Sequence, residues 1–177
     1  AMDLIEAWYS PEMNADVPRR TLNALGQAFP ILMGQFRTHE AFGRATLNQI
    51  LSAIPRRFEV RETVTLQSML FLNRGKNFVP VPLPAEAQFA PAFAVNVTDM
   101  DGDGHEDLFL SQNFFAVRPE LDRLDAGRGL WLRGDGKGGF VSVPGQVSGV
   151  EVYGEQRVAA VGDFNEDGRV DLVVTQN

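Results

Sequence analysis

Two nine-residue stretches decide the fold of this chain: Asp-Met-Asp-Gly-Asp-Gly-His-Glu-Asp at residues 99–107 and Asp-Phe-Asn-Glu-Asp-Gly-Arg-Val-Asp at residues 163–171. Each places Asp or Asn at positions 1, 3, 5 and 9, and an apolar run follows directly at 108–110 or 172–174. Alternate residues of a tightly curled loop direct several oxygens at one point, and Ca²⁺ takes about six to eight oxygen ligands. The pattern therefore predicts two calcium-binding loops, each leading into a β-strand.

The expected ligands follow from these positions. Side-chain oxygens are expected from Asp99, Asp101, Asp103 and Asp107 in the first loop, and from Asp163, Asn165, Asp167 and Asp171 in the second. His105 and Arg169, at position 7, are expected to contribute backbone carbonyls only. The first loop offers four carboxylates, whereas the second offers three carboxylates and an amide. Calcium is therefore predicted to bind more tightly at the first loop.

The EF-hand is the nearest alternative for such loops. It requires a bidentate Glu at position 12 and a helix on each side. Position 12 is Leu110 in the first loop and Val174 in the second, and both residues fall inside apolar runs typical of strands. The EF-hand is therefore excluded, and a strand on each side of the loop is expected instead.

The two loops belong to an internal repeat. Asp99 and Asp163 are 64 residues apart, as are Asp107 and Asp171, and both loops end in a similar seven-residue run, Asp-Leu-Phe-Leu-Ser-Gln-Asn and Asp-Leu-Val-Val-Thr-Gln-Asn. Hairpins are expected on each side of the first loop, at 66–81 and 130–143. A strand, a loop, a second strand and a hairpin make four strands, the content of one β-propeller blade.

The predicted fold class is therefore mainly β, with about two blades of a β-propeller. Residues 93–143 would form one whole blade, 66–81 the back half of the preceding blade and 158–177 the front half of the next. Two blades cannot close a ring of at least about four. The chain is thus expected either to be part of a longer propeller or to complete a ring with other copies of itself through open blade edges.

The N-terminal third has a different character. Residues 1–17 show no periodicity and are expected to form an irregular arm, whereas residues 18–57 are expected to be a helical segment or insertion. Pro18 is suited to a first helical position, and Thr38 to the N-cap of a second long helix that Pro55 would end. Residues 58–177 form the predicted propeller region, which opens with a β-rich run at 60–72.

The second half of the chain resembles the FG-GAP/VCBS repeats of the integrin α-subunit type, whose loops read Asp-x-Asp/Asn-x-Asp-Gly-x-x-Asp followed by Leu and an apolar strand. Both loops match this form, and Gly134-Asp135-Gly136-Lys137-Gly138 is also similar to repeat-rich bacterial proteins of that superfamily. The resemblance implies integrin-like, calcium-binding β-propeller blades interrupted by a helical insertion. It covers residues 66–177 and implies a ring with more blades than this chain holds.

Charge and composition limit the classes of partner. The net charge of −7 is concentrated in the loops, because the first carries −5 and the second −3, leaving about +1 elsewhere. The sequence has no run of Lys and Arg residues, so a nucleic-acid partner is not expected. There are no cysteines, no membrane span is expected, and no leader is visible. Weak calcium sites suit calcium-rich compartments, so an extracellular, secreted or periplasmic protein is expected.

An enzyme is not expected from this sequence. His105 lies in a calcium loop and His39 at the start of a predicted helix, and the chain has no other histidine. No nucleophile elbow, zinc-protease helix or phosphate-binding glycine loop is present. The predicted function is a non-enzymatic, calcium-stabilised scaffold or binding module for protein partners. The alternative is a non-catalytic propeller within a larger secreted hydrolase.

Overall fold

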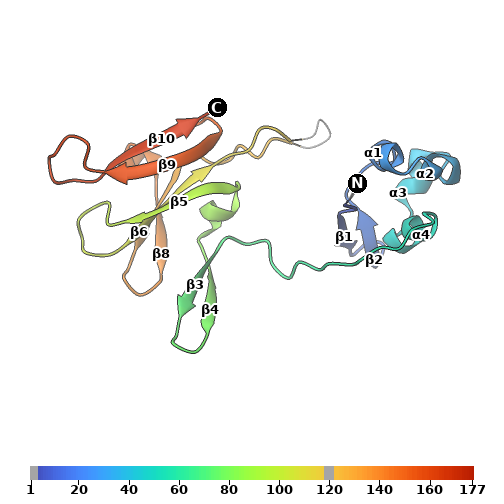
Figure 1. Ribbon diagram of the computed structural model, residues 1–177, viewed down its shortest axis with the longest axis horizontal. Coiled ribbons are helices and arrows are strands. Elements are labelled where there is room, and N and C mark those ends of the chain that lie inside the picture. Colours follow the sequence, from blue (N-terminus) through green and yellow to red (C-terminus); the bar gives the residue numbers. More distant parts are fainter. Residues whose placement is uncertain (1–3, 118–121) are drawn as a thin grey trace. The chain divides into compact units, whose positions relative to one another are not determined.

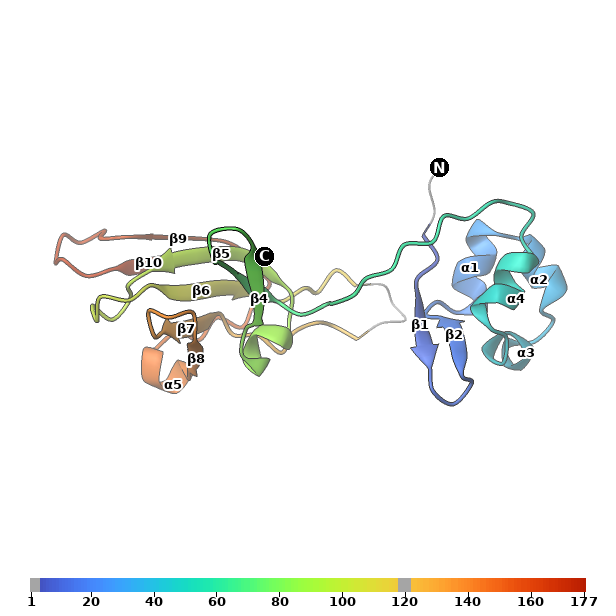
Figure 2. The ribbon, with the colours of Figure 1, turned by 90° about the horizontal axis from the view of Figure 1, so that it is seen from below.

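The computed structural model describes residues 4–117 and 122–177, which divide into two compact units, Ala1–Thr63 and Val64–Asn177 (Figure 1, Figure 2). The division falls a few residues after the predicted boundary at 57/58. The first unit combines a hairpin with short helices, whereas the second is almost entirely β. None of the helices in the described part of the chain is long and apolar enough to cross a membrane.

The predicted irregular arm at 1–17 is wrong, because most of it forms a β-hairpin. Strands β1 (Ala7–Ser10) and β2 (Ala15–Pro18) pair antiparallel. Asn14 closes the turn with a positive φ of 47°, and its side-chain oxygen accepts a 2.6 Å hydrogen bond from the Tyr9 hydroxyl. Asn tolerates the left-handed region better than most residues, so Asn14 is suited to this turn.

Four short helices follow, instead of the two longer ones predicted: α1 (Leu22–Ala28), α2 (Ile31–Gln35), α3 (His39–Gly43) and α4 (Leu47–Ser52). Pro18 is in β2, and Thr21 is the N-cap of α1. Thr38 is an N-cap, as predicted, but its helix ends at Gly43 because Thr46 starts a new one. The Thr46 hydroxyl and the Gln49 side chain form a reciprocal capping box.

Apolar side chains from these helices form the core of the first unit. Leu25, Leu32 and Ile50 are fully buried, and Phe29 and Phe42 are nearly so. The predicted β-rich run at 60–72 is only partly a strand, since β3 begins at Met69 and residues 57–68 form none. Val64 and Leu66 are almost completely exposed, so neither residue has packing that would hold an extended strand in place.

The second unit contains eight strands in three antiparallel sheets, none of which closes on itself within the described residues. Strands β3 (Met69–Asn73) and β4 (Phe78–Pro82) form a hairpin. Strands β5 (Ala92–Thr98), β6 (Asp107–Gln112), β7 (Leu130–Gly134) and β8 (Phe140–Val143) form one sheet in that order. Strands β9 (Gln156–Gly162) and β10 (Asp171–Gln176) form the third. The four-stranded sheet spans the residues predicted to be the whole blade.

Two short helical turns connect these sheets. The 3₁₀ turn η1 (Ala85–Gln88) follows β4, and α5 (Gly145–Ser148) follows β8. Both are preceded by a proline in an extended conformation, Pro84 or Pro144. The hairpin, the turn and the following strand therefore recur in the same order, which extends the internal repeat beyond the acidic loops.

The 64-residue repeat is present in the strand register itself. Thr98 pairs with Asp107 and Gly162 with Asp171, and this equivalence continues through the length of both strand pairs. Each pair ends in a bulge at the same position, where Ala92 pairs with Gln112 and Gln156 with Gln176. The two acidic segments are thus not independent turns but copies of one structural element.

The four-stranded sheet has two different faces, because side chains alternate along each strand. The Val95 face, which presents Val95 and Val97 on β5, also carries four buried leucines that pack against Ala87 of η1: Leu108, Leu110, Leu130 and Leu132. The Asn96 face, which presents Asn96, Phe109 and Trp131, is covered on its β5–β6 half by β9. The Asn96 amide donates to the Ala159 carbonyl at 3.2 Å.

Candidate metal-binding loops

The first loop connects β5 to β6 and gathers three carboxylates. One oxygen from each of Asp99, Asp101 and Asp107 lies within 4.8 Å of the others. Oxygens at this spacing can share one cation, and carboxylates are the donors that hard divalent ions such as Ca²⁺ prefer. The donor chemistry of the loop therefore fits calcium. Three of the four side chains predicted as ligands come together; the fourth, Asp103, is turned to another partner.

Backbone N–H groups fix the curl of this loop. The Asp99 carboxylate accepts hydrogen bonds from Gly102 at 2.8 Å, Asp103 at 3.1 Å and Gly104 at 2.8 Å. Gly102 and Gly104 adopt positive φ values of 77° and 86°, which L-residues rarely adopt. The loop is thus wound around its first residue, and the two glycines supply the backbone conformations that this sharp turn requires.

Asp107 ties the loop to the rest of the sheet. Its side chain is fully buried, and it accepts hydrogen bonds from Met100 N at 3.0 Å, Trp131 Nε1 at 3.1 Å and Gly134 N at 2.8 Å. Two of these donors belong to β7. Gly134 has no room for a side chain, because a Cβ there would collide with the Glu106 carbonyl. The last acidic position of the loop is therefore a structural joint as well as a candidate ligand.

Arg133 of β7 also holds the first loop. Its Nε lies 2.8 Å from Asp101 Oδ2, and its Nη2 lies 2.8 Å from Asp103 Oδ2. The hydrogen bond from Arg133 lowers the pKa of the Asp103 carboxyl, and the His105 backbone N–H lowers it further. The same Arg133–Asp103 bond raises the pKa of Arg133. The guanidinium thus neutralises part of the charge that a calcium ion would otherwise balance.

The turn between β7 and β8 packs beside the first loop. The His105 imidazole lies so close to Gly136 that a Cβ at that position would collide with it. Asp135 organises the turn by accepting hydrogen bonds from Lys137 N and Gly139 N, which lower the pKa of its carboxyl. The glycine-rich segment 134–139 is a hairpin turn, as its sequence indicates, and the His105 side chain serves as packing against it.

The second loop repeats this backbone pattern between β9 and β10. The Asp163 carboxylate accepts from Asp167 N and Gly168 N, and the Asp171 carboxylate accepts from Phe164 N at 2.9 Å. Each bond has a counterpart 64 residues earlier. Glu166 stands where the first loop has Gly102 and takes a positive φ of 61°.

The second loop nevertheless differs from the first in its surroundings. The Asn165 amide donates to Asp167 Oδ2 at 3.2 Å, so these two predicted ligands bind each other. The gathered acid at position 3 of the first loop, Asp101, is replaced by Asn165 in the second. Within the described residues no strand pairs with the outer edge of β10, so Asp171 lacks the contacts that Trp131 and Gly134 give Asp107. In both loops the backbone N–H at position 7 donates to the Asp two residues earlier: His105 N to Asp103, and Arg169 N to Asp167.

Sequence reasoning missed the three β7 residues that support the first loop. Trp131, Arg133 and Gly134 contact its acids, yet they lie more than twenty residues further along the chain. The signal that locates them is the strand order, because β7 pairs with β6 immediately after the loop. Once Leu132 pairs with Leu108, neighbouring β7 residues must face the loop residues.

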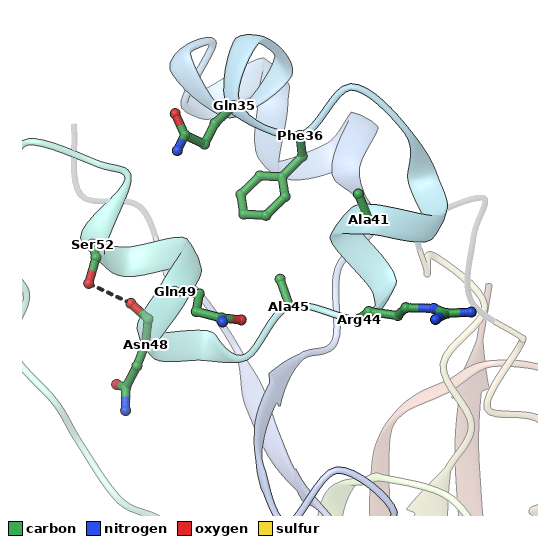
Figure 3. Close-up of a pocket in the computed structure, with 8 residues that line it drawn as sticks. All are labelled: Gln35, Phe36, Ala41, Arg44, Ala45, Asn48, Gln49 and Ser52. Atoms are coloured by element: carbon green, nitrogen blue, oxygen red, sulfur yellow. Dashed lines mark hydrogen bonds between the residues drawn. The ribbon is translucent and has the colours of Figure 1, made fainter.

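A depression on the helical unit offers no convergent chemistry. Three of its polar side chains serve the helices themselves. Figure 3 shows one of these contacts, in which the Ser52 hydroxyl donates to the Asn48 carbonyl at 2.8 Å. Gln49 belongs to the capping box of α4, and Arg44 pairs with Glu40 one turn earlier in the chain. The rest of the lining includes Phe36, Ala41 and Ala45. The acidic loops therefore remain the best candidate site in the described residues.

Comparison of the chain with protein-family models, with functionally curated proteins and with solved structures found no match.

Proposed function

We propose that residues 64–177 form a calcium-stabilised repeat module of the FG-GAP/VCBS type, in which each acidic loop binds one Ca²⁺ and locks the turn between two strands. In this proposal the module is a segment of a β-propeller, and it acts as a non-enzymatic scaffold or binding module in an extracellular or periplasmic setting. The observation that carries it is the identical strand register and bulge at two loops 64 residues apart, together with the three backbone hydrogen bonds that the loops share at their first and last acids.

A structural role alone would not require so many acids at these positions. Apart from the pairing of Asp101 and Asp103 with Arg133, a neutral Asn at either position could accept the same hydrogen bonds. The loop also places three carboxylate oxygens within 4.8 Å of one another, which costs electrostatic free energy without a cation. Calcium would remove that repulsion and convert the acids into a stabilising feature.

Linkage gives the size of the expected effect. An ion that binds only the folded state, at a concentration about a hundredfold above its dissociation constant, stabilises by about 2.7 kcal/mol. Folded domains are typically stable by about 5–15 kcal/mol, so two such sites would decide whether this module stays folded. Weak sites suffice where calcium is plentiful, which supports a location outside the cytoplasm.

Thermal unfolding with and without calcium tests this function. The full chain should unfold at a higher temperature in about 1–5 mM Ca²⁺ than in a chelator, with magnesium at the same concentration as the control. The double variant Asp101→Asn with Asp167→Asn keeps side chains of the same shape and should lose most of the shift. An unfolding midpoint that calcium leaves unchanged would contradict the proposal.

A further inference from the structure

The segment that joins the two units, residues 59–67, forms neither a helix nor a strand (Figure 1). Every residue in it is exposed, and the side chains of Val60, Val64 and Leu66 are 73%, 97% and 87% exposed. Within the described part of the chain, no backbone–backbone hydrogen bond involves this segment. Its backbone groups are therefore accessible to a second molecule without any prior opening of the fold.

The segment is bounded by an anchor on each side. Before it, Phe58 packs edge-on against Phe29, with ring centroids 6.4 Å apart, and Phe29 belongs to the buried core of the helical unit. After it, the Gln88 side chain holds Ser68 by accepting from its N–H at 2.7 Å and donating to its carbonyl at 3.0 Å. Residues 59–67 are thus the part of the connection that lies between these two anchors.

The sequence of this segment suits an extended conformation. Val60, Val64 and Leu66 alternate with polar residues, and Thr63 and Thr65 add β-branched side chains that favour strands. An endopeptidase binds its substrate as an extended strand and pairs with its backbone, in the manner of β-strand addition. A segment with strand-forming residues and an unpaired backbone therefore has the conformation that such a cleft accepts.

Only one peptide bond in this segment follows a basic residue. The segment reads Glu-Val-Arg-Glu-Thr-Val-Thr-Leu-Gln, so Arg61 is the only Lys or Arg between the two anchors. The Arg61 side chain is 81% exposed and pairs with the Glu59 carboxylate, which is 72% exposed. An ion pair as exposed as this one contributes little stability. It therefore does not keep the guanidinium out of the specificity pocket of a protease.

We propose that the Arg61–Glu62 peptide bond is a processing site for an arginine-specific endopeptidase, which separates the helical unit from the β-rich second unit. An acidic group in the specificity pocket of the protease would pair with the Arg61 guanidinium. Hydrolysis adds one water across the bond. Its hydroxyl forms a carboxylic acid on the Arg61 carbonyl carbon as the C–N bond breaks, and its other hydrogen goes to the Glu62 nitrogen. A proton then passes from the acid to the new amine.

Two other exposed basic residues show why this bond is preferred. The Arg74 N–H donates to the Asn77 carbonyl at 2.9 Å in the β3–β4 turn, and the Lys137 N–H donates to Asp135 Oδ1 at 2.7 Å in the β7–β8 turn. A protease reaches these bonds only after the turn opens, so their cleavage rates follow the small population of the open turn. Residues 59–67 need no such opening.

A cut at this bond leaves both hydrophobic cores whole. The buried cluster of the helical unit lies between Leu22 and Ile54, and that of the second unit lies between Ala87 and Leu132. Neither cluster includes a residue of 59–67, so each product is expected to stay folded. The segment also contains none of the proposed calcium ligands, so cleavage and calcium binding can succeed or fail separately.

Limited digestion of the full chain with trypsin, which cuts after Arg and Lys, tests this site. Mass spectrometry should identify residues 1–61 and 62–177 as the first products, formed about tenfold or more faster than any cut at Arg74 or Lys137. Arg61→Gln should slow the loss of intact chain by about tenfold or more, and Arg57→Gln, the matched change before the first anchor, should not. Glu62→Pro keeps Arg61 but places proline after the bond, and it should protect equally.

The rate of the first cut should be the same in calcium and in chelator. In a Trp8→Phe background, Trp131 reports the second unit, and its urea midpoint should be the same before and after the cut. A first cut at any other residue, or equal rates for the wild type and Arg61→Gln, would overturn the assignment of the site. A second unit that unfolds when the bond is cut would overturn the claim that processing separates two folded units.

Discussion

The substitution Asp→Asn at the last acidic position should have very different effects in the two loops. Asp107 is buried and accepts three hydrogen bonds through its two oxygens, two at Oδ2 and one at Oδ1. Asn has one oxygen, so at least one of these N–H donors would face an amide N–H₂ group. Among the described residues Asp171 accepts from Phe164 N alone, and the single oxygen of Asn satisfies that donor.

The size of the difference follows from the number of bonds lost. Each hydrogen bond to a charged group contributes about 1.5–3 kcal/mol, and a buried donor left unpaired costs about 1–3 kcal/mol. Asp107→Asn should therefore destabilise the second unit by about 2–4 kcal/mol, and Asp171→Asn by less than about 1 kcal/mol. Each substitution removes one negative charge from an acidic loop and so relieves a similar amount of repulsion. This contribution largely cancels when the two losses of stability are compared.

Urea unfolding in chelator, at one protein concentration, measures this difference. A Trp8→Phe background leaves Trp131 as the single tryptophan, so fluorescence reports the second unit alone. The midpoint should fall much further for Asp107→Asn than for Asp171→Asn, with similar slopes. Equal losses, within about 0.5 kcal/mol, would refute the claim that β7 supports only the first loop.

Three further predictions concern the loops. Calorimetry of Asp101→Ala and Asp167→Ala should show that the first loop binds calcium more tightly, and a stronger second site would contradict the argument from charge. Arg133→Gln should raise calcium affinity at the first loop about three- to tenfold, an effect that shrinks at high salt. It should also raise the pKa of Asp103, measured by NMR titration. Because that pKa is lowered in the folded state, the stability from the pair is present at neutral pH and is lost as pH falls below about 4. Glu166→Gly should stabilise the chain by about 0.5–1 kcal/mol in thermal unfolding, since Glu166 holds a positive φ where the first loop has Gly102; destabilisation would contradict this.

The sequence predicted the strands and loops of the second unit well because both signals there are local. Acids at positions 1, 3, 5 and 9 of a loop, followed by an apolar run, are read within nine residues, and the 64-residue spacing supplied an independent check. The strand pairs β5–β6 and β9–β10 and the hairpin β7–β8 are found where they were expected.

The errors arose where long-range packing or competing local signals decide the structure. The helix expected to continue from Thr38 is interrupted because Thr46 offers a second N-cap and forms a capping box with Gln49, which outweighs the apolar periodicity. The run at 60–72 has strand-forming residues but few contacts, and most of it forms no strand. Arg133 could not be assigned to the first loop before the pairing of β6 with β7 was known.

The number of calcium ions bound per chain tests the central claim most directly. Equilibrium dialysis with radioactive calcium, at near-physiological salt and with excess magnesium, should give two ions per wild-type chain. Asp101→Ala and Asp167→Ala should each remove one, and the two substitutions together should remove both. Binding of no calcium at millimolar concentration, or two ions still bound by the double variant, would contradict the assignment of the two loops as calcium sites.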